Sequence, residues 1–504
     1  MTERTPLQLK EEDFKELRNP PTGYERIKNK LELLEDSPIE YLRPWLTFSR
    51  DDGKVYPDQG IVETPYDYLE SSSKQMLTQE KVMETLRLRL FLLEMSNHPY
   101  KMHFLKEVQE AGFRAPRKIR CLAIEHAEAT GLSLSVGDLG ASVTGADREK
   151  QSRTQRYAEG PFVMLGKQAR MIFTGSDSPD VWNTSASIST MAASHCLATI
   201  PRNGIMTDVK RQKDLARGSF AKLDDLKSMI LGDREDAEEV ANLWKGNVGA
   251  VLESAGEKAL RRAVELFGVG VRTFRIYSPE PGTEIIDTTR ILRREFGNEI
   301  EIFSGQVIDI IQARKLEEAG ADGIFVGIGG GGRCITGVRS GSVIDWPMLV
   351  WNLRGQINIP IVVEGGASDH IAVSLLLGAT AISTSRVVAG GTIESPGGIL
   401  YCSDGKGKLF KPYGGEASAR TKFLEGKVLP FDIPSFVEGE TSEAELSYIK
   451  HVLPTLTYNL HLLNEEAILT MVFRNVATVE ELHAINPSPL KRSTGFDFMQ
   501  RNTH

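Results

Sequence analysis

The chain has 504 residues, of which 40% are hydrophobic and 25% charged, and its formal net charge is −8. This composition is typical of an ordinary globular protein. A chain of this length can bury a core large enough to fold without disulfide bonds or a bound metal. The negative charge disfavours nucleic acid as a partner of the whole chain. No apolar run reaches the roughly 18 residues that a membrane span needs.

The cysteine pattern and the N-terminus point to a reducing compartment. The four cysteines lie far apart and form no CxxC pair; they are Cys121, Cys196, Cys334 and Cys402. This spacing argues against a structural zinc site and against a secreted disulfide framework. The first residues, MTERTPLQLKEED, resemble neither a secretion signal nor a transit peptide. We therefore expect a cytoplasmic protein without a bound metal.

The N-terminal region, 1–115, is charged and helix-patterned. Within it, 79–95 places apolar residues at helical spacing. The sequence therefore predicts a helical N-terminal extension. Its role stays open between a substrate lid, an oligomer contact and a packing appendage.

The rest of the chain changes character near residue 246. Before it, short β-forming runs lie at 119–124, 162–165 and 170–173, followed by a charged helical stretch at 214–230. After it, runs of strand length alternate with amphipathic runs of helix length. The predicted strands are 247–252, 273–277, 301–304, 323–326, 359–363 and 381–384. The predicted helices are 257–267, 284–296, 307–319, 346–353 and 371–377.

This alternation predicts βαβ units in a parallel sheet. Two helices end in similar phrases, EAGADGIFVG and LLGATAISTS, with Gly320 and Gly378 where a helix C-cap favours a left-handed residue. Such repetition is typical of a βα barrel, but an open doubly wound sheet has it as well.

The segment 327–336, GIGGGGRCIT, directly follows a predicted strand. Its consecutive glycines allow the backbone to approach a ligand and to point N–H groups at an anion. Cys334 lies there beside Arg333, Thr336 and Arg339, an environment that suits a nucleophilic thiolate. The alternative is a small buried residue in a tight loop.

Three later segments carry further candidate groups. In VVEGGAS, Glu364 precedes two glycines, which suits a ribose diol and a phosphate, or a plain strand-to-helix turn. In STSRVVAGG, three hydroxyls stand beside Arg386, as in the phosphate sites of many barrels. The long polar stretch 401–428 resembles a lid over a barrel mouth, or a solvated loop.

Taken in order, six segments closely resemble the inosine-monophosphate dehydrogenase / guanosine-monophosphate reductase family. GADGIFVGIGGGGRCIT resembles the loop of the family's nucleophilic cysteine, and IPIVVEGGAS resembles a strand that ends in an acid and two glycines. VVAGGTIESPGGILY, KPYGGEAS and FLEGKVLPF are similar to the connection into the flap, its start and its end. NVATVEELHAINPSPLKRSTGF is similar to the C-terminal tail. Together they cover about residues 245–495.

The resemblance implies an α/β fold, a TIM (β/α)₈ barrel over 116–504 with a flap at about 401–428 and a C-terminal tail. It also implies that Cys334 adds to C2 of a purine monophosphate. In a dehydrogenase, hydride then leaves to NAD⁺ and water hydrolyses the adduct. In a reductase, the cysteine displaces ammonia from guanosine monophosphate and NADPH delivers the hydride.

The resemblance assigns roles to individual residues. The implied catalytic residues are Cys334, Thr336 and Arg420. The implied substrate-binding residues are Gly332, Glu364, Gly365, Gly366, Ser385, Arg386, Tyr413, Gly415, Glu416 and Glu425. The implied cofactor-binding residues are Tyr277, Ser278, Gly327 and Gly329.

The chain also departs from the family pattern. Gly332 replaces a phosphate-binding serine, and Glu364 replaces an aspartate. The strand end RIYSPEPG has Tyr277 where a cofactor-binding aspartate is expected, and Arg420 is followed by Thr421 rather than by the tyrosine of the water-activating pair. These departures, with a short flap, fit a reductase or a changed reaction better than hydrolysis.

The resulting hypothesis is a purine-nucleotide oxidoreductase of the IMP dehydrogenase type that uses NAD, with a GMP reductase that uses NADPH as the alternative. A protein that only binds a nucleotide, as a sensor or assembly subunit, and an enzyme for another phosphorylated heterocycle stay open. The resemblance further implies a homotetramer and a possible monovalent cation.

Overall fold

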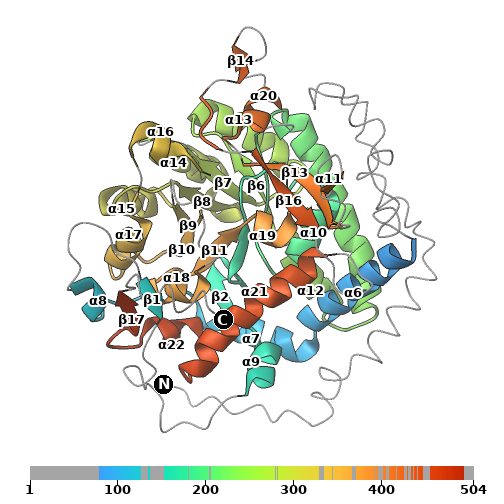
Figure 1. Ribbon diagram of the computed structural model, residues 1–504, viewed down its shortest axis with the longest axis horizontal. Coiled ribbons are helices and arrows are strands. Elements are labelled where there is room, and N and C mark those ends of the chain that lie inside the picture. The colour runs from blue at the N-terminus through green and yellow to red at the C-terminus, as the bar shows by residue number, and fades with distance from the viewer. Residues whose placement is uncertain are drawn as a thin grey trace.

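The computed structural model describes residues 79–125, 134–136 and 152–492, with gaps at 180, 204–205, 279, 281, 328–333, 343, 366–369, 391, 396–400, 404–407, 416, 425–427, 430–432, 435, 440 and 447–453. Its centre is an eight-stranded parallel sheet curled into a barrel (Figure 1). The strands are β4 (Phe173–Gly175), β5 (Ala198–Ile200), β6 (Val248–Leu252), β7 (Thr273–Tyr277), β8 (Glu301–Gly305), β9 (Gly323–Val326), β10 (Ile361–Val363) and β11 (Ala381–Thr384).

The barrel closes almost completely between β4 and β5. The sheet runs from β4 through β11 and back in order to β5. Thr174 and Leu197 form a parallel bridge across the remaining seam, and Gly175 N donates to Leu197 O at 2.7 Å. The predicted TIM-type barrel is therefore confirmed, and its first two strands lie in the region before residue 201.

Helices surround the barrel (Figure 1). They are α10 (Ser185–Ala193), α11 (Val209–Leu226), α12 (Ala237–Gly246), α13 (Gly256–Phe267), α14 (Glu284–Phe296), α15 (Ile310–Glu318), α16 (Thr336–Ser340), α17 (Trp346–Leu353), α18 (Ile371–Leu377), α19 (Arg386–Ala389), α21 (Leu456–Phe473) and α22 (Val479–His483), with short turns at Lys227–Leu231 and Gly297–Glu299. Helix α13 is typical, because it buries Ala259, Ala263 and Leu266 on one face. Gly320 and Gly378 have φ of +93° and +123°, as predicted for residues that end helices.

The N-terminal helices pack on the barrel from outside. Helix α6 (Gln79–Ser96) contacts α21, and α7 (Pro99–Ala111) contacts the segment β2 (Phe162–Leu165) and the short α9 (Arg153–Glu159). The described part of the predicted extension therefore holds helices. None of the helices in the described stretches is long and apolar enough to cross a membrane.

One predicted β run is wrong. The stretch 119–124 contributes to a helical turn, α8 (Leu122–Glu125), in which Glu125 N donates to Cys121 O at 2.9 Å. A short apolar run has no period long enough to distinguish a strand from a helical turn. The nearby β1 (Leu134–Val136) pairs antiparallel with β17 (Leu490–Arg492) from the C-terminal tail.

The predicted flap begins a small antiparallel sheet. Strand β13 (Lys408–Gly414) pairs with β12 (Tyr401–Ser403) and with β16 (Thr441–Leu446). Between β13 and β16 lie α20 (Ala419–Leu424), β14 (Val428–Leu429) and β15 (Ile433–Pro434). The structured segment thus continues beyond residue 428, where the predicted flap ends.

A β-hairpin covers the amino end of the barrel. Strands β2 and β3 (Gln168–Met171) pair antiparallel across a turn at Gly166 and Lys167. Gly166 has φ +73°, and a Cβ there would lie 2.7 Å from Glu301 Oε1. Glycine is required because this turn packs directly on the Glu301 carboxylate.

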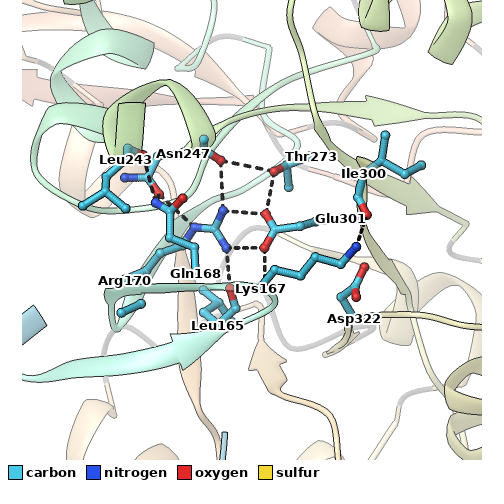
Figure 2. Close-up of polar contacts among 12 residues, drawn as sticks. Leu165, Lys167, Gln168, Arg170, Leu243, Asn247, Thr273, Ile300, Glu301 and Asp322 are labelled. Carbon is cyan, nitrogen blue, oxygen red and sulfur yellow. Dashed lines mark hydrogen bonds and ion pairs between the residues drawn. The ribbon is translucent and has the colours of Figure 1, made fainter. Parts of the chain in front are cut away.

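Arg170 of the hairpin forms a buried ion pair with Glu301 (Figure 2). Their Nη2–Oε2 and Nη1–Oε1 distances are 2.6 and 3.1 Å. Asn247 Oδ1 accepts from Arg170 Nε at 2.8 Å, and the Thr273 hydroxyl donates to Glu301 Oε2 at 2.7 Å. Burial alone would raise the pKa of Glu301, but Arg170 and these hydrogen bonds hold it below its ordinary value.

Replacing Arg170 by methionine should destabilise the fold by about 3–5 kcal/mol, because Glu301 would remain buried without a counter-ion. The loss should be measured by urea unfolding at pH 7. It should shrink as the pH falls. Without Arg170, burial raises the pKa of Glu301 above its ordinary 4.5, so protonation relieves the variant first, and below 4.5 the wild type in turn loses the contribution of its ion pair. Lys210→Met, which breaks an exposed pair with Asp214, is the control and should change little. An equal effect of both variants would contradict the role of the buried pair.

Candidate active site

Polar side chains gather where the barrel strands end. Asp177 lies two residues after β4, Tyr277 ends β7, Gln306 directly follows β8, and Glu364 directly follows β10. All eight strands are parallel, so their carboxyl ends meet at one mouth of the barrel. This mouth is the usual place for the active site of a TIM barrel.

Protein donors surround the Glu364 carboxylate. Arg275 Nη1 lies 3.1 Å from Oε1 and Arg275 Nη2 lies 2.5 Å from Oε2. Gln306 Nε2 also donates to Oε2, and the Ser383 hydroxyl donates to Oε1 at 3.2 Å. Each oxygen accepts two hydrogen bonds, which fills the roughly four acceptor sites of a carboxylate.

Arg275 is a charged residue in the barrel interior, and its side chain is only 1% exposed. Its guanidinium lies 4.0 Å from the centroid of the Phe325 ring and 5.1 Å from that of Tyr277. Burial alone would lower the pKa of Arg275, but Glu364 and Asp177 raise it above its ordinary value. Arg275 therefore stays protonated, with Glu364 as its counter-ion.

Asp177 is a second buried acid at the mouth. Its Oδ1 accepts from the backbone N of Arg202 at 3.2 Å, and its Oδ2 accepts from Asn203 Nδ2 at 3.4 Å. Burial raises the pKa of the Asp177 carboxyl, and the charges of Arg202 and Arg275 oppose this rise. A buried carboxyl with a raised pKa at the mouth of a barrel is a candidate functional group.

Cys334 begins a chain of hydrogen bonds toward a carboxylate. The half-buried thiol donates to Thr336 Oγ1 at 3.1 Å, and the Thr336 hydroxyl donates to Glu438 Oε2 at 2.9 Å. A proton on the thiol thus has a direct route through a hydroxyl to an acid. This arrangement can activate a sulfur nucleophile.

Backbone contacts fix the cysteine segment to the segment that carries Glu438. Ile335 N donates to Glu438 O at 2.8 Å, and Cys334 forms an antiparallel bridge with Gly439. Gly439 in turn bridges Ser418, next to helix α20 of the flap. The flap and the cysteine segment are therefore one connected unit.

Gly327 has a structural reason to be glycine. It directly follows β9 with φ +148°, and a Cβ there would lie 1.9 Å from the backbone oxygen of Glu364. Any side chain would therefore push the ends of β9 and β10 apart. Gly365, with φ +82°, lets the chain turn immediately after Glu364.

The two predicted cofactor residues at the end of β7 differ in their surroundings. Tyr277 is half-buried beside Arg275 and offers an aromatic face. The Ser278 hydroxyl accepts from Glu280 N at 3.2 Å and donates to Glu280 O at 3.3 Å, so it is used in a local turn. At the end of β7, an aromatic side chain thus stands in place of the expected cofactor-binding carboxylate.

The remaining predicted residues lie partly outside the described structure. Ser385 precedes α19 and accepts from Ala389 N at 2.9 Å, while the Gly415 carbonyl accepts from the Thr421 hydroxyl at 2.8 Å. Neither contact brings these two residues to Cys334. Outside the described residues lie Gly329, Gly332, Gly366, Glu416 and Glu425, and the side chains of Arg386, Tyr413 and Arg420.

The sequence did not single out Arg275, Gln306 or Glu438. The sequence did offer a reason to single out Arg275, since a charged residue inside the strand-like run TFRIY must find a buried partner. It offered none for Glu438, because 102 residues separate that residue from Thr336. Only the fold brings these groups together.

Comparison with known proteins identifies the barrel. A family model described as the IMP dehydrogenase / GMP reductase domain matches residues 165–442, more than half of the chain. Inosine-5'-monophosphate dehydrogenase 1 of Arabidopsis thaliana is 32% identical over 192 residues, 36% of this chain and 37% of that protein. The inosine-5'-monophosphate dehydrogenase of Mycobacterium leprae is 31% identical over 179 residues, 34% of this chain and 32% of that protein.

These alignments span about a third of the relatives' own length. The family match includes the barrel from the end of β2, the cysteine segment, the Glu364 network and Glu438. The chain therefore belongs to the IMP dehydrogenase / GMP reductase family.

Proposed function

We propose that this chain is a purine-nucleotide oxidoreductase in which Cys334 bonds to C2 of a purine nucleoside monophosphate. The observation that carries the proposal is the hydrogen-bonded chain from Cys334 through Thr336 to Glu438. Mere binding of a nucleotide needs no thiol with a proton route to an acid. Family membership supports the same chemistry and a nicotinamide cofactor.

In the proposed mechanism the Cys334 thiol loses its proton to the Thr336 hydroxyl, while Thr336 passes its own proton to Glu438. The sulfur then adds to C2 of the purine ring, and the electron pair of the C2–N3 double bond moves to N3, which takes up a proton. In the dehydrogenase direction a nicotinamide cofactor would accept the hydride that leaves C2. In the reductase direction ammonia would leave C2, and the cofactor would donate a hydride there. Tyr277, half-buried at the end of β7, is the proposed neighbour of the nicotinamide, because the resemblance implies a cofactor-binding residue at this position.

The dehydrogenase direction with NAD is the first candidate, and one observation favours the reductase with NADPH as the second. Hydrolysis of the adduct needs a group that activates water. Thr421, next to Arg420, is fully buried and its hydroxyl is bound to the Gly415 carbonyl. It therefore presents no base to the mouth. The homotetramer stays a prediction from the resemblance, and the cytoplasmic location stays a prediction from the cysteine pattern and the N-terminal residues.

Cys334→Ala should abolish turnover while the variant still binds the nucleotide. The purified chain should be incubated with inosine monophosphate and NAD⁺, or with guanosine monophosphate and NADPH, while absorbance of the reduced nicotinamide is followed. Whichever pair of nucleotide and cofactor gives turnover shows whether the chain acts as a dehydrogenase or as a reductase. Cys121→Ala removes a buried thiol outside the mouth and should leave turnover in place. Full activity of Cys334→Ala would refute the proposal.

The proton route predicts a graded effect at Thr336. Thr336→Ser keeps the hydroxyl and should retain most activity, whereas Thr336→Val and Glu438→Gln should lower kcat by roughly 10²–10⁴-fold, the usual contribution of general acid–base catalysis. KM should change little, because neither side chain is assigned to substrate binding. The measurement is steady-state kinetics across pH. Equal kcat values for the serine and valine variants would exclude the route.

Glu364 leads to a prediction about the sugar. The resemblance implies that it binds the ribose, but its acceptor sites are filled by Arg275, Gln306 and Ser383. We propose that it serves as the counter-ion of Arg275 instead. The dissociation constants of inosine monophosphate and its 2′-deoxy form, measured by calorimetry, should then agree within about 3-fold. A hydrogen bond to a charged acceptor would separate them by roughly 10- to 150-fold, and a preference of that size, lost in Glu364→Gln, would restore the ribose role.

A further inference from the structure

A cavity lies at the opposite end of the barrel strands from Cys334. Its volume is about 30 Å³. Helices α6, α7, α9 and α21 and the amino ends of β4 and β5 enclose it, and these helices contact one another in the structure (Figure 1). Its polar lining includes Lys101, Tyr157, Cys196, His461 and Asn464.

Lys101 of α7 is a buried cation for which the described part of the chain supplies no acidic partner. The residue is 5% exposed, and among the described residues no hydrogen bond or ion pair reaches its ammonium. The Tyr157 ring lies 5.0 Å from Nζ and offers only a weak cation–π contact. A buried charge left in this state is costly unless a counter-ion binds it.

The titratable groups around Lys101 do not supply that counter-ion. Burial raises the pKa of the Cys196 thiol and of the Tyr157 phenol, so both stay neutral at pH 7. Burial lowers the pKa of His195 to about 3 and also lowers that of His461, so neither carries a charge that would change this balance.

The acids in this region are used elsewhere. Glu159 forms a buried ion pair with Arg156 of its own helix. Glu465 has a side chain 52% exposed and lies 3.6 Å from His461 Nε2. Burial lowers the pKa of Lys101 itself to about 8, so the amine remains mostly protonated at pH 7.

The amide oxygen of Asn464 is a second polar atom of the cavity. The residue is 4% exposed, and no hydrogen-bond donor among the described residues reaches its buried Oδ1. The oxygen and nitrogen of an asparagine amide exchange places by a half-turn of the group. Asn464 can therefore present N–H donors to a ligand that Lys101 also binds.

We propose that this cavity binds a small monovalent anion between the Lys101 ammonium and the Asn464 amide. The single negative charge of the anion would compensate the positive charge of Lys101. Apolar walls from Leu92, Phe162 and Leu460 restrict the occupant to halide or formate size and disfavour a strongly hydrated polyvalent ion.

The bound anion would connect the N-terminal helices to the barrel. Lys101 belongs to α7, whereas Asn464 belongs to α21, which follows the flap in sequence. An ion held by both side chains stabilises the docking of α7 against α21. Because only the folded chain has this site, thermal stability should rise with the concentration of the ion.

Bromide is the direct probe, since its anomalous scattering distinguishes it from water. Crystals of the full chain soaked in sodium bromide should show an anomalous peak within hydrogen-bond distance of Lys101 Nζ. In solution, the Tm should rise as bromide replaces the bulky anion gluconate at constant ionic strength. Formate should give the same rise and should displace the bromide peak.

Lys101→Met removes the charge at similar volume and should abolish both the peak and the bromide-dependent rise in Tm. Lys106→Met, on the exposed side of the same helix, is the matched control and should behave as the wild type. A cavity without an anomalous peak, or a bromide response equal in all three proteins, would overturn the proposal. If Lys101→Met does not fold, the wild-type anomalous map decides alone.

Discussion

Closure of eight parallel strands into a ring is the constraint on which the rest of this structure depends. It sends alternate side chains of every strand into one shared interior, so a charged residue placed there must find its counter-ion across the ring. Among the described residues, one pair meets this demand across the ring, and a second meets it with an arginine of the covering hairpin. Arg170 and Glu301 lie at the amino end, where the β2–β3 hairpin covers the barrel, and Arg275 and Glu364 lie near the mouth.

The two pairs separate stability from chemistry. The amino-end pair is enclosed by the hairpin turn, and nothing there suggests a reaction. The Arg275–Glu364 pair lies at the base of the candidate site. The cysteine segment is held instead by its contacts with the flap region. Because Cys334 and Gly439 are bridged and Thr336 donates to Glu438, the proposed nucleophile, its proposed proton route and the flap are held as one unit. The chemistry that we propose depends on that unit more than on the strand ends themselves.

The sequence was sufficient for the barrel, whereas Cys334 as a nucleophile stays a prediction. Strand-length runs such as 273–277 and the helix-ending Gly320 and Gly378 depend on local pattern, and the structure contains them. It was insufficient where a contact joins distant segments. Arg275 meets Glu364 across 89 residues, and Thr336 meets Glu438 across 102. The run at 119–124 failed for the opposite reason, since it is too short to show a period.

The most direct test of the account is a crystal structure of the chain with inosine monophosphate and NAD⁺. We expect the purine at the mouth, with continuous density between Cys334 Sγ and C2 and with Glu438 still hydrogen-bonded to Thr336. A nucleotide bound with its C2 far from the sulfur, or with the Thr336–Glu438 contact broken, would contradict the central claim that this relay carries the chemistry.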